Sequence, residues 1–352
     1  GCDFKKLLKD VPQVKKFVDS IDENYYTALN PHDADFGGRT CLWPLLDSRR
    51  NSGRQFTRKL NKILAVIWIL TTPESYRSVA ERFDMSKSDL WLAFVKVVSA
   101  LNTISPEVIV WPNRENRQQT VQSFQNVAGL RGVVGDVHGT YIRIKTPQVY
   151  PQSYTCRKFY SAITLQGISN NNLYFLDCFT GYPGSVADIR IFRQSDIYNE
   201  LTNDRQLFLD DDQFIIGDKA YPLEPWCITP WVANRVSTPR EINFNTAHAR
   251  TRTAIERAWA LFFGRFRRMQ YLDMSRIDLI PSTIIACCVL QNICRMDPNS
   301  LIELFEQEGQ IFMGADNPDN QNDRHEDDVA PYVANETGEA RRERLANEVM
   351  DL

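Results

Sequence analysis

The sequence predicts an α/β protein in which a mixed β-sheet is flanked by helices and preceded by a helical region. The residues before about 125 have the spacing of helices, and from Gly132 the pattern changes to that of strands. The apolar run Phe214–Ile216 stops at Gly217 and Asp218, as a short buried strand does. Strands with interspersed helices are typical of a mixed sheet that is covered on its faces.

Composition and charge narrow the class of protein. The chain has 352 residues, 43% of them hydrophobic, so we expect a globular protein of about two domains. Residues 301–352 carry a charge of −10, which leaves a basic body of +7. A basic body is compatible with nucleic acid, and the acidic tail either weakens non-specific DNA binding or keeps the protein soluble. We see no signal peptide and no apolar stretch of 18 or more residues, so we expect an intracellular chain without a membrane segment.

The eight cysteines do not form a metal-binding pattern. No two of them have the C-x-x-C spacing, which argues against a zinc site built from cysteines. The adjacent Cys287 and Cys288 lie in an apolar helical run, where free cysteine packs as a small hydrophobic side chain.

The first third of the chain is predicted to be helical. Residues 1–55 form a helical and linker segment, and residues 56–125 form a helical region. Within the latter, Glu74–Phe83 and Lys87–Leu101 are two helices joined by a short turn, which is the outline of a helix-turn-helix or of an ordinary helical hairpin. The pattern favours neither, and only the charges at Arg77, Arg82 and Lys87 favour DNA.

The second part of the chain, residues 130–298, is predicted to be the α/β domain. Val133–His138 and Tyr141–Lys145 are two strands or one interrupted strand. Lys158–Leu165 and Leu173–Phe179 flank the turn-rich Ser169–Asn172 and therefore predict a β-hairpin.

Helices complete this part of the chain. A short helix runs through Asp188 to Phe192, and Pro281–Met296 has the spacing of a core-packing helix. The tail at 313–352 is predicted to be acidic and largely disordered, although a charged helix over Glu336–Leu352 stays open.

Two acids stand at positions where chemistry could occur. Asp218 ends a predicted strand, and Glu256 lies 38 residues later on a helix rich in arginine. Together they could hold one divalent cation, and oxygen ligands suit Mg²⁺ or Mn²⁺. The structural alternative is that Asp218 caps a turn and Glu256 pairs with Arg252, four residues earlier on the helix.

Four segments in order resemble the PIF/Harbinger transposases and the Harbinger transposase-derived nuclease of animals. They are Gly132–Pro147 (GVVGDVHGTYIRIKTP), Gly181–Ser195 (GYPGSVADIRIFRQS), Ile215–Pro230 (IIGDKAYPLEPWCITP) and Phe244–Met269 (FNTAHARTRTAIERAWALFFGRFRRM). The resemblance covers roughly residues 55–300, and four linked motifs in order are a specific match.

The resemblance implies an RNase H-like fold of the DDE type, in which carboxylates hold two metal ions, Mg²⁺ or Mn²⁺, that cut DNA. By motif, Asp218 and Glu256 are catalytic acids, and Asp188 matches a further acidic position of the family. His248 and Arg252 match its His-x-x-x-Arg stretch. The resemblance also implies DNA and a Myb/SANT-like protein as partners, no membrane, and a nuclear and cytoplasmic location. It leaves open whether the chain forms a homodimer.

The first motif departs from the family pattern. Its register places His138 where the first catalytic Asp belongs, and Tyr141 replaces the usual His. Asp136 lies two residues earlier on the same face of the strand, about 6–7 Å along it, so it could serve only if the strand bulged or shifted register. The candidate metal ligands are Asp188, Asp218, Glu256, His138 and Asp136.

These residues support two hypotheses. In the first, the chain is a domesticated, transposase-derived protein whose cleavage is weakened or lost because one ligand of a two-metal site is a histidine. In the second, it is an active metal-dependent DNA endonuclease that uses the acids at 188, 218 and 256, with Asp136 as a substitute. Both predict a DNA-binding surface, for which the candidates are Arg250, Arg252, Arg257, Arg265, Arg268 and Lys87.

Overall fold

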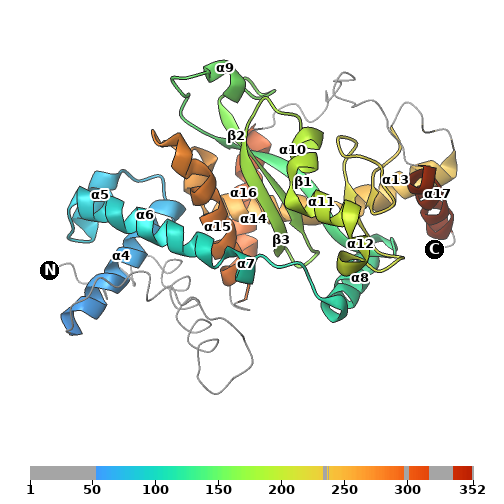
Figure 1. Cartoon of the computed structure of the whole chain (residues 1–352), viewed down its shortest axis with the longest axis horizontal. Helices are drawn as coiled ribbons and strands as arrows, with labels where there is room; N and C mark the ends of the chain where they lie inside the picture. Colours follow the sequence, from blue (N-terminus) through green and yellow to red (C-terminus); the bar gives the residue numbers. More distant parts are fainter. Residues whose placement is uncertain (1–52, 233–235, 237, 297–300, 317–335, 351–352) are drawn as a thin grey trace. The chain divides into compact units, whose positions relative to one another are not determined.

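A computed structural model describes residues 53–232, 236, 238–296, 301–316 and 336–350 (Figure 1). The predictions for residues 1–52, and for the Asn/Asp-rich stretch at 317–335, lie outside these ranges. The chain divides into two compact units. The first contains the described residues up to Ile109 together with Leu261–Phe312, and the second contains Val110–Ala260 and the described residues from Met313. Residues 261–296 of the predicted α/β domain at 130–298 are grouped with the helices of the first unit.

The first unit is helical. Its elements are α4 (Gly53–Thr71), α5 (Tyr76–Arg82), α6 (Lys87–Thr103), α7 (Ser105–Val108), the short 3₁₀ turns η2 (Arg267–Gln270) and η3 (Ile277–Leu279), α15 (Ile280–Arg295) and most of α16 (Ile302–Asp316). The amide of Asn102 on α6 donates to the carbonyl of Ser282 on α15 at 2.8 Å, and α15 packs against α6. The predicted core-packing helix is therefore confirmed as α15.

The predicted pair of helices is confirmed as α5 and α6. Each begins at a serine whose side chain accepts a backbone N–H of its own first turn, Ser75 from Ser78 and Ser86 from Asp89. Asp84, in the turn between them, adopts a left-handed backbone with φ of 50°. Whether this pair binds DNA stays a prediction.

The segment Ile277–Arg295 corrects the prediction that the chain has no apolar stretch of 18 or more residues. Its 19 residues are long and apolar enough to span a membrane, by length and composition. However, 67% of an 18-residue stretch of this segment is buried inside the protein, and the polar Gln291 and Asn292 are buried with it. The segment is therefore explained as the core helix of the first unit.

The second unit contains a five-stranded mixed sheet with the order β3-β2-β1-β4-β5. The strands are β1 (Val133–Arg143), β2 (Ala162–Ser169), β3 (Phe175–Pro183), β4 (Phe214–Gly217) and β5 (Cys227–Ile228). The pairs β1·β2 and β2·β3 are antiparallel, whereas β1·β4 and β4·β5 are parallel. This is the RNase H-like arrangement, and the predicted fold class is confirmed.

The local sequence explains these strands. The two runs around Gly139 form the single strand β1, which pairs along β2 from Asp136 to Arg143. The hairpin between β2 and β3 turns where predicted, and the side-chain oxygen of Asn170 accepts the backbone N–H groups of Asn172 and Tyr174 at 3.0 Å.

Helices cover both faces of the sheet. They are α8 (Arg114–Ala128), α9 (Pro151–Tyr154), α10 (Asp188–Gln194), α11 (Asp196–Asn203), α12 (Arg205–Phe208), α13 (Pro239–Thr251), α14 (Thr253–Arg265) and α17 (Glu336–Met350). One apolar core joins Val137 and Ile215 of the sheet to Phe192 of α10. The other joins Ile216 to Phe244 of α13 and to Ala254 of α14. Successive residues of β1 and β4 therefore face opposite cores.

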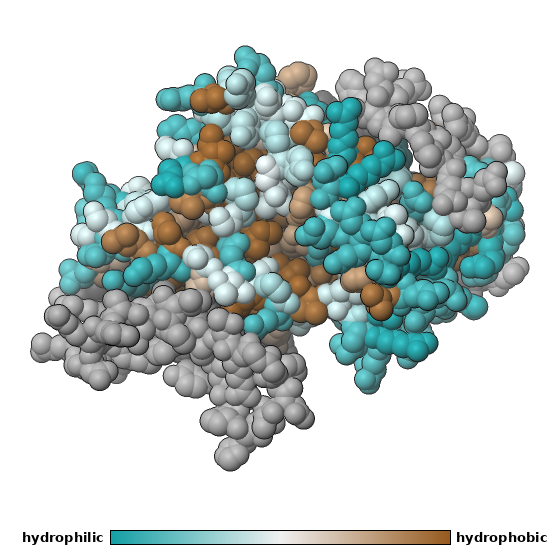
Figure 2. Space-filling model, viewed as in Figure 1, coloured by the Kyte–Doolittle hydropathy of each residue, from teal (hydrophilic) through white to brown (hydrophobic). Residues whose placement is uncertain are grey.

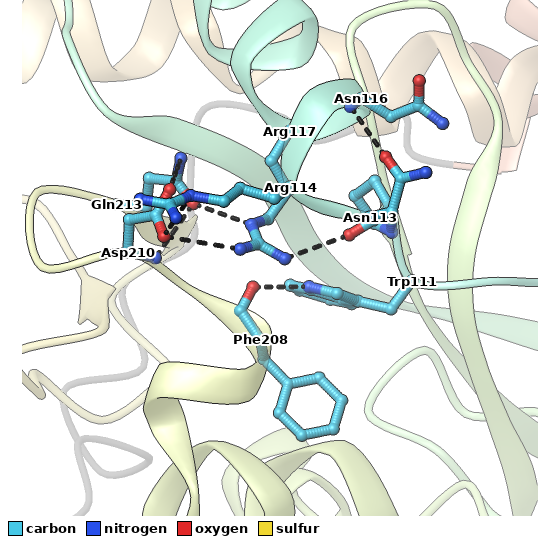
Figure 3. Close-up of polar contacts among 9 residues, drawn as sticks. Trp111, Asn113, Arg114, Asn116, Arg117, Phe208, Asp210 and Gln213 are labelled. Carbon is cyan, nitrogen blue, oxygen red and sulfur yellow. Dashed lines mark hydrogen bonds and ion pairs between the residues drawn. The ribbon is translucent and has the colours of Figure 1, made fainter.

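A buried polar cluster holds the start of this unit to the loop before β4 (Figure 3). The indole N–H of Trp111 donates to the carbonyl of Phe208 at 2.8 Å. The buried Arg117 donates to the side chain of Gln213 at 3.0 Å and lies 3.5 Å from the Asp210 carboxylate. Because its guanidinium has these partners, Arg117 can be buried at the base of α8.

The end of the chain differs from the predicted disordered tail. Met313–Asp316 continue α16, and Glu336–Met350 form α17, which packs against α13 and β5. Leu345 and Ala346 enter the same core as Phe244. The charged helix that the sequence left open is therefore formed. Its burial depends on contacts with segments far away in sequence, which composition alone does not reveal.

Gly264 supplies a test of packing in the first unit. A Cβ at this position would lie 1.8 Å from the carbonyl oxygen of Phe305 on α16, so a methyl group on residue 264 would collide with the backbone of α16. We expect Gly264→Ala to lower the free energy of unfolding by about 3 kcal/mol, at the upper end of overpacking effects. Urea titration followed by circular dichroism measures this change. Gly314→Ala is the matched control because nothing lies within 4 Å of its Cβ, and an equal loss in both variants would contradict the prediction.

Candidate active site

The parallel pairing of β1 and β4 brings His138 and Asp218 together. Val137 pairs with Gly217, so the residues that follow, one on each strand, are neighbours. His138 Nδ1 lies 3.6 Å from Asp218 Oδ2, and both side chains are largely buried. The other carboxylate oxygen of Asp218 accepts the backbone N–H of Ala220 at 2.8 Å. Asp218 therefore both caps the turn after β4 and faces the histidine.

The histidine is a neutral imidazole at neutral pH. Burial lowers the pKa of His138 to about 4, Asp218 opposes this shift, and the charges of Arg252 and Arg157 add to it. Its Nδ1 atom is buried and makes no hydrogen bond within the described residues. A neutral imidazole with a free ring nitrogen next to a carboxylate is a donor pair that could accept a cation.

Asp136 has a different environment. Its side chain is completely buried, and Oδ2 accepts the backbone N–H of Ile255 at 3.4 Å while Oδ1 lies 3.7 Å from Arg252 Nε. Burial raises the pKa of Asp136 well above its usual value, and Arg252 opposes the shift. Asp136 thus ties β1 to the first turn of α14.

Arg252 also determines how Glu256 is presented. The helix predicted around these residues is interrupted at Arg252, which follows the last residue of α13, and α14 begins at Thr253. The guanidinium lies 4.0 Å from the Glu256 carboxylate, which is 57% exposed. Glu256 therefore pairs with Arg252, as the structural alternative from the sequence predicts.

Asp188 lies on the other side of β1. A Cβ added to Gly139 would lie 2.8 Å from Asp188 Oδ1, whereas the adjacent His138 faces Asp218. Because side chains alternate along a strand, the Asp188 carboxylate lies on the face opposite His138. Tyr221 is buried near both Asp188 and Asp218, and burial raises its pKa, with both acids adding to the shift.

His248 has a structural contact. Its Nε2–H donates to the carbonyl of Ile228 at 3.1 Å, and the ring packs on Phe244 with 5.8 Å between centroids. Burial lowers the pKa of His248 to about 4, although this hydrogen bond opposes the shift. His248 therefore fastens α13 to β5, one turn before Arg252.

Of the six predicted DNA-binding cations, Arg252 lies beside Asp136 and Glu256, and the other five fall into two groups. Arg250, Arg257 and Lys87 are exposed. Arg265 is buried and donates to Gln291 at 2.8 Å, and Arg268 is buried and donates to the carbonyls of Ile69, at 2.6 Å, and Glu74. These two arginines hold the helices of the first unit together, so we exclude them from the proposed DNA surface.

These positions allow a test of whether the site fits two divalent ions. His138 and Asp218 supply two adjacent donors, but Asp136 faces Arg252, Glu256 lies beside the same guanidinium, and Asp188 lies across the strand. Among the residues that the structure describes, no three His, Cys, Asp or Glu side chains gather around one point. A two-ion site needs more oxygen ligands than this arrangement presents.

Two residues near the site were missed by the sequence analysis. Arg157 acts on His138 from the loop after β1, and Tyr221 lies between two acids. Tyr221 stands three residues after Asp218 within a motif already identified, so its position was available as a signal. Arg157 had no comparable signal because its proximity depends on the folding of the loop.

Comparison with known proteins and the four sequence motifs point to the same family. Residues 137–292 match the family described as DDE superfamily endonuclease. The chain carries a DDE-superfamily endonuclease domain. The resemblance to Harbinger transposase-derived nucleases is therefore confirmed. This DDE domain contains every residue of the candidate site except Asp136, which lies one position before the matched range.

Two curated relatives extend the match beyond the DDE domain. "Putative nuclease HARBI1" of Homo sapiens is 27% identical over 286 residues, which cover 78% of this chain and 79% of that protein. "Protein ALP1-like" of Arabidopsis thaliana is 26% identical over 246 residues, which cover 66% of this chain and 60% of the relative. No solved structure matches the chain.

The buried His248 predicts how stability depends on pH. Its pKa is lower in the folded state than in the unfolded chain, so the unfolded chain binds the extra proton between about pH 6.5 and 4. The contribution of His248 to stability is therefore complete above pH 6.5 and is lost as the pH falls towards 4. We expect the free energy of unfolding of His248→Gln to fall less steeply across this window, by up to about 1.4 kcal/mol per pH unit.

Urea titrations at several pH values from 7 to 4.5 measure this difference in slope. The comparison between variants removes the contributions of other titrating groups, which both proteins share. Parallel slopes for the unaltered protein and His248→Gln would contradict the assignment of a neutral, buried imidazole.

Proposed function

We propose that this protein is a domesticated, Harbinger transposase-derived DNA-binding protein whose DDE site cleaves DNA weakly or not at all. One observation carries the proposal. His138 stands beside Asp218 at the end of paired β1 and β4, at the position of the family's first acid, with 3.6 Å between Nδ1 and Oδ2. A neutral imidazole there contributes no negative charge to a site that must hold two dications.

Nearby acids do not replace the missing charge. Asp136 could act only if it turned towards Asp218, but it is completely buried and faces Arg252 and the Ile255 N–H. The strand bulge in β1 lies between Val133 and Gly135, before Asp136, and the pairing from Asp136 to Val137 with β4 is regular. Asp136 could act as the first metal ligand only if the strand bulged or shifted register. The pairing of Asp136 and Val137 with β4 shows no such shift.

The alternative is an active endonuclease that uses Asp188, Asp218 and Glu256. All three acids are retained, and Glu256 is exposed enough to reorient. The position of Asp188 opposes this alternative, since its carboxylate lies against Gly139 on the other face of β1. If the protein does cleave DNA, we expect Mg²⁺ or Mn²⁺ to be the cofactor, held by Asp218, Glu256 and His138.

Phosphate binding does not need an intact catalytic site. Arg250 near the end of α13 and Arg257 on α14 are exposed, and the Arg252 guanidinium lies beside Asp136 and Glu256. Exposed arginines can neutralise phosphates of duplex DNA. We therefore propose duplex DNA as the partner of this face. From the family resemblance we also propose a Myb/SANT-like protein as a second partner and the nucleus and cytoplasm as the location.

Restoring the acid tests the cause of weak cleavage. We expect His138→Asp to gain Mg²⁺- or Mn²⁺-dependent nicking of supercoiled plasmid, at least tenfold above the unaltered protein, because it supplies a hard oxygen ligand and a negative charge. His138→Asn is the matched control: it has the same size without the charge, and we expect no gain.

Two outcomes would contradict this interpretation. One is robust cleavage by the unaltered protein that is lost in Asp218→Asn, which would show that His138 is an adequate ligand. The other is cleavage that is lost in Asp136→Asn while the melting temperature is unchanged, which would make Asp136 a catalytic ligand. If neither His138→Asp nor the unaltered protein cuts, the missing acid is not the sole cause of inactivity.

A salt titration tests the phosphate contacts. We expect the logarithm of duplex affinity to fall linearly with the logarithm of salt concentration, and Arg250→Gln or Arg257→Gln to reduce the slope by about 1 each. Fluorescence anisotropy with a labelled duplex measures the slope. Arg276→Gln is the matched control, because Arg276 is exposed but already paired with Asp278 at 2.6 Å. An affinity that does not change with salt would exclude phosphate binding.

A further inference from the structure

The connection between β1 and β2 carries large apolar side chains that face solvent. Phe159 is 91% exposed, Tyr150 is 76% exposed and Val149 is 64% exposed. The connection contains α9, which projects beyond the sheet in Figure 1, and apolar residues are visible among polar ones at that end of the molecule in Figure 2. Single exposed apolar side chains are ordinary on protein surfaces, but here three of them lie within one connection.

The backbone of this loop is well defined by its own contacts. Thr155 and Ser161 form an antiparallel bridge, and the Phe159 N–H donates to the carbonyl of Cys156 at 2.9 Å. The hydroxyl of Ser185 donates to the carbonyl of Ser153 at 2.6 Å and so holds the loop to the segment after β3. The exposed rings therefore stand on a structured support.

Both aromatic residues adopt a strained backbone. Tyr150 has φ of 50° and Phe159 has φ of 62°, the left-handed region that bulky side chains rarely occupy. Only two other non-glycine residues in the described part of the chain share this conformation, Asp84 and Leu173. Strain of this kind persists where the surrounding structure enforces it, and it concentrates at functional sites.

The charge around the rings has a single sign. Residues 143–160 contain Arg143, Lys145, Arg157 and Lys158 and no acid, although the protein as a whole carries −3. The loop also reaches the candidate active site, because the Arg157 guanidinium lies 5.9 Å from the ring centre of Tyr141 on β1 and its charge acts on His138. Basic residues interleaved with exposed aromatic rings are the composition of surfaces that bind single-stranded nucleic acid.

We propose that the loop from Lys145 to Tyr160 binds unpaired DNA bases next to the candidate active site, with Tyr150 and Phe159 stacking on the bases and Arg157 and Lys158 contacting phosphates. Paired bases in a duplex hide their faces, so an exposed ring can stack only on bases that are unpaired. The ligand class is therefore DNA with a single-stranded segment, such as a fork or a frayed end. This inference rests on the proposed DNA-binding function and adds a preference for DNA with unpaired bases over a blunt duplex.

The test compares three labelled probes by fluorescence anisotropy with the full chain: a 20-nucleotide single strand, a blunt duplex of the same sequence and a forked duplex. Phe159→Asn and Tyr150→Asn remove the rings while asparagine tolerates the left-handed backbone. We expect each variant to lose about fivefold or more in affinity for the single strand and the fork, and less than twofold for the blunt duplex. Leu207→Asn is the matched control, since Leu207 is 73% exposed on α12, and we expect no change.

The outcomes separate this inference from the proposed function. Binding of the blunt duplex alone, or equal losses on all three probes, would overturn the loop assignment and leave DNA binding intact. Binding of none of the probes would overturn both. Tighter binding of RNA of the same sequence, or loss in Phe159→Asn of binding to vesicles that contain phosphatidylserine, would assign the loop to RNA or to a lipid surface instead. Unchanged melting temperatures of both variants confirm that the folded support is retained.

Discussion

The candidate site depends on the parallel pairing of β1 with β4. That pairing sets Val137 beside Gly217, so the next residues, His138 and Asp218, meet at one edge of the sheet. It also directs Asp136 into the core on the side of α14 and leaves Gly139 against Asp188 on the other side. One register therefore decides which acids can act together, and a single residue of slip would exchange the two faces.

Much of the fold could be predicted from local sequence. The apolar run before Gly217 predicts a strand from a few residues, and β4 confirms it. The asparagine-rich turn at Asn170 likewise predicts a hairpin, which β2 and β3 confirm. The sequence left the charged helix at 336–352 open and could not decide it, because Leu345 and Ala346 of α17 are buried in a core with Phe244, which is far away in sequence. The grouping of Leu261–Phe312 with the N-terminal helices could not be predicted either, because it depends on contacts between segments far apart in sequence.

The site was only partly accessible from sequence. The family motifs identified His138, Asp218 and Glu256, of which Asp218 follows the end of β4, Glu256 lies in the first turn of α14 and His138 lies within β1. The resemblance placed Asp188 with them, and the structure sets its carboxylate beside Gly139, a position that spacing along the chain does not reveal. The sequence analysis also grouped Arg265 and Arg268 with exposed arginines, because charge alone does not distinguish a guanidinium that contacts DNA from one that holds backbone carbonyls, as Arg268 does for Ile69.

Arg252 has a consequence for how such a protein can change over time. Its guanidinium lies 3.7 Å from the Asp136 carboxylate and 4.0 Å from that of Glu256, so the positive charge beside these two acids comes from within the chain. A site that supplies its own positive charge does not need bound ions to keep its carboxylates from repelling one another. The architecture and the chemistry are therefore separable under mutation. Substitution at residue 138 can therefore leave these contacts, and the fold that they hold, in place.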